Sequence, residues 1–399
     1  MKIAILTSGI LPVPAVQGGA VENLIDFYLE YNEKHRLHDI TVYSVAHEST
    51  CGNSALHSTI NHYIYFYVNS LSAKIIKKAK HLATGQGYYH DTILYYLDQS
   101  VRDMRKKEFD LIVVENRPGY IPRLRREFPS QNIVLHLHND LLNADVPLSN
   151  EIYNATDGVI TISDYIASRV GTIRGSVDKC TTVYNGIDID RFSPKAEKRN
   201  RKNYGISDDD FLLIFSGRII HEKGISYIID ALHLLANHPQ IKLLVLGSSF
   251  YDNGSNSSDF INMLKEKSKG LDQRIVFTGY ISYDQMPSML SMADAAVLPS
   301  VWEEPLGMTC IEAMAMGLPL ITTARGGIPE IVTPDCATIL TVDNDLPSSI
   351  AKAIVDLYDN PDKRKMMGER GIAAAKTLSK ERYAAHFFQA VEQRNNNRP

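Results

Sequence analysis

Residues 301–323, VWEEPLGMTCIEAMAMGLPLITT, decide the fold of the chain. They follow a short apolar run at residues 295–300, AAVLPS, which suits a strand that is buried on both faces. After the turn that ends at Gly307, apolar positions continue in a helical pattern to Met316, and Gly317 ends that helix. The apolar run LPLITT comes next. This succession of strand, loop, helix and strand predicts one unit of a parallel α/β sheet.

Two carboxylates, Glu304 and Glu312, bracket the loop-to-helix turn of this unit. The loop is expected at the carboxyl end of a parallel strand, where the first helical turn offers unpaired N–H groups to an anion. Glu312 follows Glu304 by about two helical turns, so both side chains can face one ligand, and a diphosphate suits this position. In the alternative interpretation, the two residues are ordinary helix-start acids that favour the helix dipole.

Apolar strand-like runs alternate with helical patterns in both halves of the chain, which predicts an α/β protein with two doubly wound parallel sheets. The length of 399 residues also favours two domains. A polar stretch at residues 193–210 is the best linker, so we expect domains at residues 1–193 and 194–378. A last helical pattern at residues 379–394 is expected to pack back on the first domain.

Composition excludes several classes of function. The chain has 42 basic and 46 acidic side chains and a formal charge of −4. It therefore lacks the overall excess of positive charge that is typical of proteins that bind nucleic acid. The four cysteines are widely spaced and form no CxxC pair, so neither a zinc site nor a disulfide framework is indicated. No stretch approaches the roughly 20 apolar residues of a membrane span. We therefore expect a cytoplasmic protein.

Each predicted domain has one glycine-containing loop directly after a strand. In the first domain, Gly18 and Gly19 precede a helix, and the loop matches neither the dinucleotide fingerprint nor a P-loop. In the second, the segment FSGRIIHEKG contains Arg218 at the strand end and Lys223 near the next helix. Two cations at that edge can neutralise a diphosphate. The alternatives are a glycine pair chosen for turn geometry alone and a solvated Arg and Lys.

His138 is the candidate catalytic residue of the first domain. In the run NIVLHLHND, strand alternation puts His136 and His138 on one face, and His138 lies nearer the carboxyl end, where ligands collect. Asn139 and Asp140 follow in the loop and can reach an acceptor. A structural histidine that is hydrogen-bonded to the backbone remains the alternative interpretation of His138.

Four segments together resemble the retaining nucleotide-sugar glycosyltransferases of glycosyltransferase family 4: GGAVENL, NGID, GRIIHEKG and EPLGMTCIEAMAMGLPLITTARGGIPEI. The spacing Glu304-x7-Glu312 is the most specific of these features. The segments occur in order from Gly18 to Glu330, so the resemblance spans nearly the whole chain. It implies the GT-B fold, in which two Rossmann-like domains face a central cleft, and a nucleoside-diphosphate sugar as donor, UDP-, dTDP- or GDP-linked.

The resemblance also implies roles for matching residues of the second domain. Arg218 and Lys223 would hold the donor diphosphate, Glu312 would bind the ribose hydroxyls, and Glu304 would bind the donor sugar near its reacting face. Further positions share a role in enclosing the donor: the backbone N–H groups of Gly307, Met308 and Thr309 would meet phosphate or sugar oxygens, and Tyr280 and Ile281 would enclose the base.

In the first domain, the resemblance implies that Gly18 and Gly19 let the domain close on the diphosphate and acceptor side. It places His138 close to the donor sugar, where the histidine would contact the sugar or support the positive charge of the transition state. The implied reaction transfers a hexosyl or deoxyhexosyl group with retention of configuration, and the leaving diphosphate accepts the proton of the acceptor hydroxyl.

The motif Asp188-x-Asp190 matches the DxD spelling of metal-dependent glycosyltransferases of a different fold. Here it belongs to the NGID segment, and Arg218 and Lys223 already provide the counter-charge. We therefore predict that the enzyme requires neither a metal nor any other cofactor.

The acceptor is indicated only indirectly. Residues 71–127 contain 12 Lys and Arg against 7 Asp and Glu, and the run AKIIKKAKHL alternates lysines with apolar residues. Such a segment can lie on an anionic membrane surface and receive a lipid-linked glycan, although a solvated basic helix face is the alternative. Bacterial proteins with this overall pattern commonly extend capsule, cell-wall or O-antigen chains, so we expect a peripheral enzyme of surface polysaccharide synthesis. A GT-B epimerase or phosphorylase, or a non-catalytic sugar-nucleotide-binding partner, remains an alternative function.

Overall fold

The structure is a computed structural model that describes residues 1–399 except 51, 71–72, 75–87, 248–258 and 397–399. The chain forms two compact units: residues 1–186 with the C-terminal segment from Lys380 make unit 1, and Ile187–Ser379 makes unit 2. The boundary therefore lies at residue 186/187 and not at residue 193/194. Ile187 already bonds to Leu378 and Ser379, which attaches the chain to unit 2 before its polar linker begins.

Unit 1 contains a seven-stranded, wholly parallel sheet with the strand order β3-β2-β1-β4-β5-β6-β7. Its strands are β1 (Lys2–Leu6), β2 (Asp39–Val45), β3 (Asn61–Phe66), β4 (Leu111–Glu115), β5 (Asn132–Leu137), β6 (Gly158–Thr161) and β7 (Cys180–Thr182). Its helices are α1 (Ala20–His35), α3 (Tyr88–Met104), α4 (Ile121–Glu127), α5 (Ser149–Ala155), α6 (Asp164–Gly171) and α14 (Lys380–Asn396). The strand order reverses beside β1, between β1 and β4, as in doubly wound folds.

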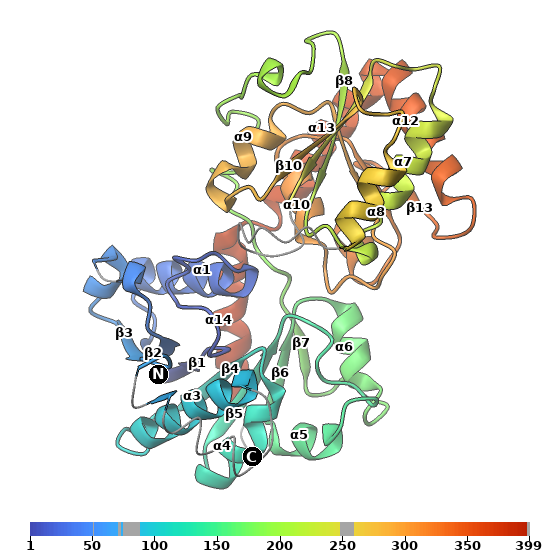
Figure 1. Ribbon diagram of the computed structural model, residues 1–399. Coiled ribbons are helices and arrows are strands. Elements are labelled where there is room, and N and C mark those ends of the chain that lie inside the picture. The colour runs from blue at the N-terminus through green and yellow to red at the C-terminus, as the bar shows by residue number, and fades with distance from the viewer. Residues whose placement is uncertain (51, 71–72, 75–87, 248–258, 397–399) are drawn as a thin grey trace. The chain divides into compact units, whose positions relative to one another are not determined.

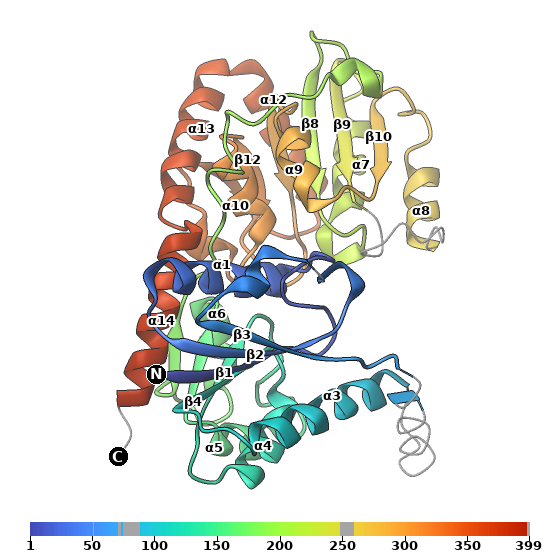
Figure 2. The same cartoon turned by 90° about the vertical axis from the view of Figure 1, so that its left-hand side faces the viewer.

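Helices cover both faces of this sheet. Figures 1 and 2 show α1 and α14 side by side on one face, whereas α3, α4 and α5 lie on the other. Because both faces are covered, the central strands carry almost continuous apolar runs, and every residue of β4 and β5 is buried. The carboxyl ends of these two strands are thereby held at one edge of a rigid sheet.

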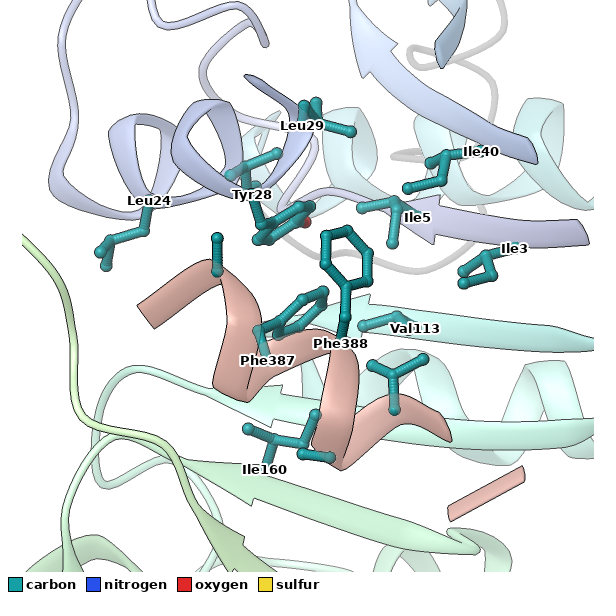
Figure 3. Close-up of a cluster of buried hydrophobic side chains, with 14 of the residues drawn as sticks. Ile3, Ile5, Leu24, Tyr28, Leu29, Ile40, Val113, Ile160, Phe387 and Phe388 are labelled. Carbon is teal, nitrogen blue, oxygen red and sulfur yellow. The ribbon is translucent and has the colours of Figure 1, made fainter. Parts of the chain in front are cut away.

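The core under α1 is completed by the last helix of the chain. Tyr28 of α1 stacks on Phe387 of α14, with ring centroids 4.2 Å apart and planes within 7° of parallel, and Phe388 packs edge-on beside them (Figure 3). Aliphatic side chains of β1, β2 and β4, among them Ile5, Ile40 and Val113, lie beside these rings and complete the cluster. The helix expected at residues 379–394 thus exists at Lys380–Asn396 and forms one wall of the unit 1 core.

Unit 2 contains a six-stranded parallel sheet with the order β10-β9-β8-β11-β12-β13. Its strands are β8 (Phe211–Ser216), β9 (Ile241–Leu246), β10 (Ile275–Gly279), β11 (Ala295–Leu298), β12 (Leu320–Thr323) and β13 (Ala337–Leu340). Its helices are α7 (Ile225–Leu234), α8 (Asp259–Lys267), α9 (Met286–Leu290), α10 (Met308–Ala315), α11 (Ile328–Ile331), α12 (Leu346–Asp359) and α13 (Pro361–Lys376). Contacts pair α7 with α12 and α10 with α13.

Three strands were not predicted from the sequence: β3, β7 and β13. Each lies at an edge of its sheet, where only one neighbour pairs with it. Their side chains are mostly half-buried rather than buried, so these strands lack the long apolar run that identifies a central strand.

Candidate functional site

The loop after β11 brings Glu304 against Lys223. Lys223 Nζ lies 2.5 Å from Glu304 Oε1, and the two side chains are only 19% and 8% exposed. The hydroxyl of Ser300 donates a second hydrogen bond to the same oxygen at 2.6 Å. Ser300 Oγ also lies 3.0 Å from the carbonyl oxygen of Glu222, so its single hydroxyl proton is shared between an acceptor in each of the two loops. The carboxyl ends of β8 and β11, which are neighbours in the sheet, thus build one charged site.

Two glycines allow the backbones of this site to approach closely. A Cβ atom on Gly224 would lie 2.0 Å from the carbonyl oxygen of Pro299, and one on Gly326 would lie 2.0 Å from that of Glu304. Both glycines have a positive φ, of 72° and 55°. The amide of Gly327 donates to the Glu304 carbonyl at 2.8 Å. The loop that follows β12 therefore fixes the backbone from which the Glu304 side chain projects.

Helix α10 begins directly beyond this loop. Gly307 precedes the helix with φ of 99°, and Met308 and Thr309 form its first turn. The first N–H groups of an α-helix have no carbonyl partner within the helix, and they lie at the positive end of its dipole. The three positions predicted to supply backbone N–H groups are thus at a helix N-terminus, and no acidic side chain occupies the first turn. An anion placed here would be stabilised.

Glu312 is buried on α10, with 7% of its surface exposed. Burial raises the pKa of Glu312 to about 8, and the positive charge of Arg191 opposes the shift only in part. Burial also raises the pKa of Tyr283, and Glu312 adds to that shift. Arg191 lies over the Tyr283 ring at 4.7 Å and forms an ion pair with Asp284. Glu312 is therefore a carboxyl group that is largely protonated at neutral pH.

Cys310 shows how close the predicted donor residues of unit 2 lie to one another. Burial raises the pKa of its thiol to about 12, and its smaller electrostatic influences come from Glu304, Lys223 and Glu312. Lys223, predicted from one sequence segment, and the two glutamates, predicted from another, are therefore within electrostatic reach of one buried sulfur atom.

The other predicted donor residues of unit 2 lie in neighbouring loops. Arg218 follows β8, and its side chain is exposed without an ion-pair partner in the part of the chain that the structure describes. Tyr280 and Ile281 follow β10; Tyr280 is exposed and Ile281 is half-buried. The aromatic ring that the structure associates with Glu312 is Tyr283, which the sequence analysis did not single out.

In unit 1, His138 belongs to a buried cluster at the ends of β4 and β5. Its Nε2 atom lies 2.9 Å from Glu115 Oε2, and His136 Nδ1 lies 3.1 Å from the same oxygen. The Tyr28 hydroxyl donates to Glu115 Oε1 at 3.0 Å. His136 also packs against Phe387 of α14, at 5.3 Å between ring centroids, so α14 contacts the cluster directly.

The protonation of this cluster follows from its surroundings. Burial opposes ionisation of Glu115, but the two histidines outweigh that effect and lower the pKa of Glu115 to about 2. Burial lowers the pKa of His138 to about 4, although its bond to Glu115 acts in the opposite direction. At neutral pH the cluster thus contains a carboxylate and a neutral His138.

Glu115, His136 and His138 also form a group with metal-binding side chains, whose donor atoms lie within 4.8 Å of one another. Here, however, both rings are at hydrogen-bonding distance from the carboxylate, and Tyr28 supplies a third donor. These bonds account for the geometry of the group. The DxD-like motif has a structural explanation too, because Asp188 Oδ1 accepts hydrogen bonds from the backbone N–H groups of Asp190 and Arg191.

The remaining residues predicted in unit 1 lie in loops at the carboxyl ends of its strands. Gly18 and Gly19 have φ of 74° and 104°, and Gly19 is the residue that precedes α1. Asp140 accepts hydrogen bonds from Arg169 at 2.7 Å and from Asn143 at 2.7 Å, so its carboxylate orders its own loop. Asn139 is half-buried beside it.

The sequence did not reveal three residues that contact the predicted site residues and hold them in place: Glu115, Ser300 and Gly326. Glu115 ends the run LIVVE, and a lone acid at the end of a buried strand that neighbours the His136-x-His138 strand was a usable signal. No local pattern singles out Ser300 or Gly326, because their roles depend on contacts with distant loops.

Among the described residues, no helix is both long and apolar enough to cross a bilayer. The basic run AKIIKKAKHL lies almost wholly outside the described residues, since only Ala73 and Lys74 of it are described.

The chain is similar to known proteins both in sequence and in fold. Residues 196–374 match the family model "Glycosyl transferases group 1". Two Bacillus subtilis (strain 168) proteins are similar over most of their length: the putative glycosyltransferase YtcC, 28% identical with 98% of this chain and 92% of its own covered, and spore coat protein SA, 27% identical with 92% and 93% covered.

Among solved structures, Anabaena Alr3699/HepE in complex with UDP and glucose superposes with a TM-score of 0.72 and 19% identity, covering 98% of this chain and 99% of that one. This likeness shows the shared fold of two parallel-sheet α/β domains. The chain is a glycosyltransferase with the GT-B architecture, and its unit 2 contains a glycosyl transferases group 1 domain.

Proposed function

We propose that this glycosyltransferase moves a sugar from a nucleoside-diphosphate sugar to a hydroxyl of a glycan or lipid-linked glycan, with retention of anomeric configuration. The observation that carries the proposal is the Lys223–Glu304 pair beside the N-terminus of α10. A diphosphate needs positive charge and N–H donors, and a sugar needs hydrogen-bond acceptors. This edge of unit 2 offers all of these, from the loops that follow β8 and β11 and from the first turn of α10.

Four ionisable residues of unit 2 have a defined part in this proposal: Arg218, Lys223, Glu304 and Glu312. Lys223 has three N–H donors, so it can keep its bond to Glu304 and still reach a phosphate oxygen. Arg218 adds a second cation without a competing partner among the described residues. Glu304, held by Lys223 and Ser300, presents its second carboxylate oxygen to a sugar hydroxyl. Glu312 accepts hydrogen bonds from the ribose hydroxyls.

The donor nucleotide is proposed to be a uridine diphosphate. The structural neighbour Alr3699/HepE was solved with UDP-glucose, which supports UDP as the first nucleotide to test. The experiment is a thermal-shift screen with UDP-, GDP- and dTDP-sugars, because a ligand that binds only the folded state raises apparent stability. We expect a UDP-sugar to raise the melting temperature more than the others. If no nucleotide sugar stabilises the wild-type protein, the proposed donor class is wrong.

Retention would follow if the leaving diphosphate takes the proton of the acceptor hydroxyl on the same face of the sugar. In that mechanism the enzyme positions both substrates and stabilises the positive charge of the transition state. No protein base is then needed. The anomeric configuration of the product, read by NMR from an α-linked donor, tests this directly: an α-linked product is expected, and a β-linked product contradicts retention.

The proposed place of the reaction is bacterial surface polysaccharide synthesis, at the inner face of the plasma membrane. The net basic charge of residues 71–127 supports an anionic surface as partner. Liposome co-sedimentation tests this point: binding should increase with anionic lipid, and equal binding to neutral vesicles removes the membrane from the proposal.

A further inference from the structure

Two consecutive residues at the end of β4 hold both the ring and the backbone of His138. The carboxylate of Glu115 lies 2.9 Å from His138 Nε2, and the side-chain oxygen of Asn116 accepts a hydrogen bond from the His138 amide at 3.1 Å. The Asn116 amide in turn donates to the His136 carbonyl at 2.8 Å. Asn116 has a φ of 53°, a left-handed conformation that asparagine tolerates better than most residues.

This arrangement selects one tautomer of the His138 ring. An ionised carboxylate only accepts hydrogen bonds, so the ring nitrogen facing Glu115 must carry a proton. His138 is neutral at pH 7, because burial holds its pKa well below that pH. The proton therefore resides on Nε2, and Nδ1 keeps a lone pair. Nδ1 is a buried atom without a hydrogen-bond partner among the described residues.

We propose that Glu115 is a positioning residue that fixes His138 in its Nε2–H tautomer, so that the Nδ1 lone pair accepts a hydrogen bond from a substrate hydroxyl. The substrate contact rests on the proposed function, whereas the tautomer does not. In this account His138 acts as a neutral acceptor and not as a cation. Protein atoms cover Nδ1 in the structure, so the loops at this edge must shift for a hydroxyl to reach it.

His136 shares the carboxylate but differs in its surroundings. It lies within β5 and faces Phe387, whereas His138 follows the strand end, at the edge where ligands bind in parallel sheets. His136 therefore serves as the second donor that keeps Glu115 ionised and oriented, and His138 is the member of the cluster that lies nearer the ligand-binding edge of the sheet.

The tautomer can be read without any activity. Full-length protein labelled with ¹⁵N-histidine gives two-bond ¹H–¹⁵N correlations, and the His138 signals are assigned by their loss in His138→Gln. At pH 7 we expect a protonated Nε2 and an unprotonated Nδ1. A wild-type His138 that carries its proton on Nδ1, or on both nitrogens, overturns the proposal. On addition of UDP-glucose, the Nδ1 signal should shift, whereas UDP alone should leave it in place.

Glu115→Met removes the acceptor while it keeps a similar volume. We expect a mixture of His138 tautomers and a kcat that is lower by roughly 10- to 100-fold with a donor KM within about threefold. Val113→Ala is the matched control, because Val113 lies two residues earlier on β4 and is fully buried but bonds to neither histidine. The control should lose stability yet keep the tautomer and the rate.

The result that contradicts the positioning role is a Glu115→Met protein that retains the single Nε2–H tautomer or the wild-type kcat. If that variant does not fold, the wild-type spectrum still decides. If no nucleotide sugar is turned over, the proposed function fails, and the tautomer measurement decides separately whether Glu115 positions His138.

Discussion

Lys223 Nζ and Glu304 Oε1 lie 2.5 Å apart at the carboxyl edge of the unit 2 sheet, and both side chains are largely buried. A buried carboxylate that loses its cation is costly, because neither water nor another charge replaces the lost partner. We therefore expect Lys223→Ala to lower the free energy of unfolding by about 1–3 kcal/mol, measured by urea titration. Lys202→Ala is the control, since Lys202 and Asp208 form a mostly exposed pair, and it should change the free energy of unfolding much less than Lys223→Ala does.

The double variant Lys223→Ala/Glu304→Gln separates the pair from the individual side chains. Once Glu304 is neutral, loss of the lysine should matter less, so the two effects should not add. Additive effects within about 0.3 kcal/mol would show that the pair contributes no coupling energy to unit 2.

Gly326→Ala tests how the Glu304 backbone is held. The added Cβ would lie 2.0 Å from the Glu304 carbonyl oxygen, so the loop must move in addition to accepting a strained positive φ. We expect a loss of about 2 kcal/mol or more in unfolding free energy, with weaker donor binding. Gly270→Ala is the matched control, because Gly270 also has a positive φ but has open space around it. Equal losses in the two variants would mean that the contact with Glu304 is unimportant.

The raised pKa of Glu312 predicts a pH-dependent stability. Between pH 4.5 and about 8 the folded protein keeps a proton on Glu312 that the unfolded chain has lost. Stability should therefore fall as the pH rises through this window, by at most about 1.4 kcal/mol per pH unit from this group. Glu312→Gln removes the contribution, so its stability relative to the wild type should rise with pH. A constant difference between the two proteins from pH 5 to 8 would exclude the raised pKa.

Donor binding should also release the Glu312 proton if this residue binds the ribose. Hydroxyl donors favour the carboxylate over the neutral acid, so the pKa of Glu312 falls on binding. Calorimetry with UDP at pH 7, in two buffers with different ionisation enthalpies, should show a fraction of one proton released, and Glu312→Gln should abolish that release. Release that persists in the variant assigns the proton to another group.

Metal dependence can be tested by removing divalent cations with EDTA. Arg218 and Lys223 are proposed to supply the counter-charge of the diphosphate, so transfer should continue in EDTA at close to its original rate. A loss of transfer in EDTA that magnesium or manganese reverses would show that a cation is needed in addition to these residues.

The central parts of the fold could be predicted from the sequence because they depend on local patterns. Strands such as β5 and β11 are short, fully buried and mainly apolar, and the turn before α10 is marked by Gly307. The edge strand β13 could not be predicted in this way, since its side chains are half-exposed and its sequence lacks a continuous apolar run. The unit boundary was placed seven residues late, because the contact of Ile187 with Ser379 depends on a segment nearly 200 residues away.

The same distinction applies to the site. Lys223, Glu304 and Glu312 belong to recognisable segments, and the structure brings them into electrostatic reach of Cys310. The supporting contacts are different in kind. The contact of Ser300 with the Glu222 carbonyl and the bond from Tyr28 to Glu115 join residues that are 78 and 87 positions apart, and no local pattern encodes such pairings.

The proposal that Glu304 binds the donor sugar is tested most directly by the rate of acceptor-dependent nucleoside-diphosphate release in Glu304→Gln. The carboxamide that replaces the carboxylate can still accept a hydrogen bond from Ser300, so the variant should fold, which its melting temperature checks. The account predicts a rate at least about 100-fold below that of the wild type, because a charged contact to the transition state is lost. A folded Glu304→Gln protein with nearly wild-type turnover would contradict it.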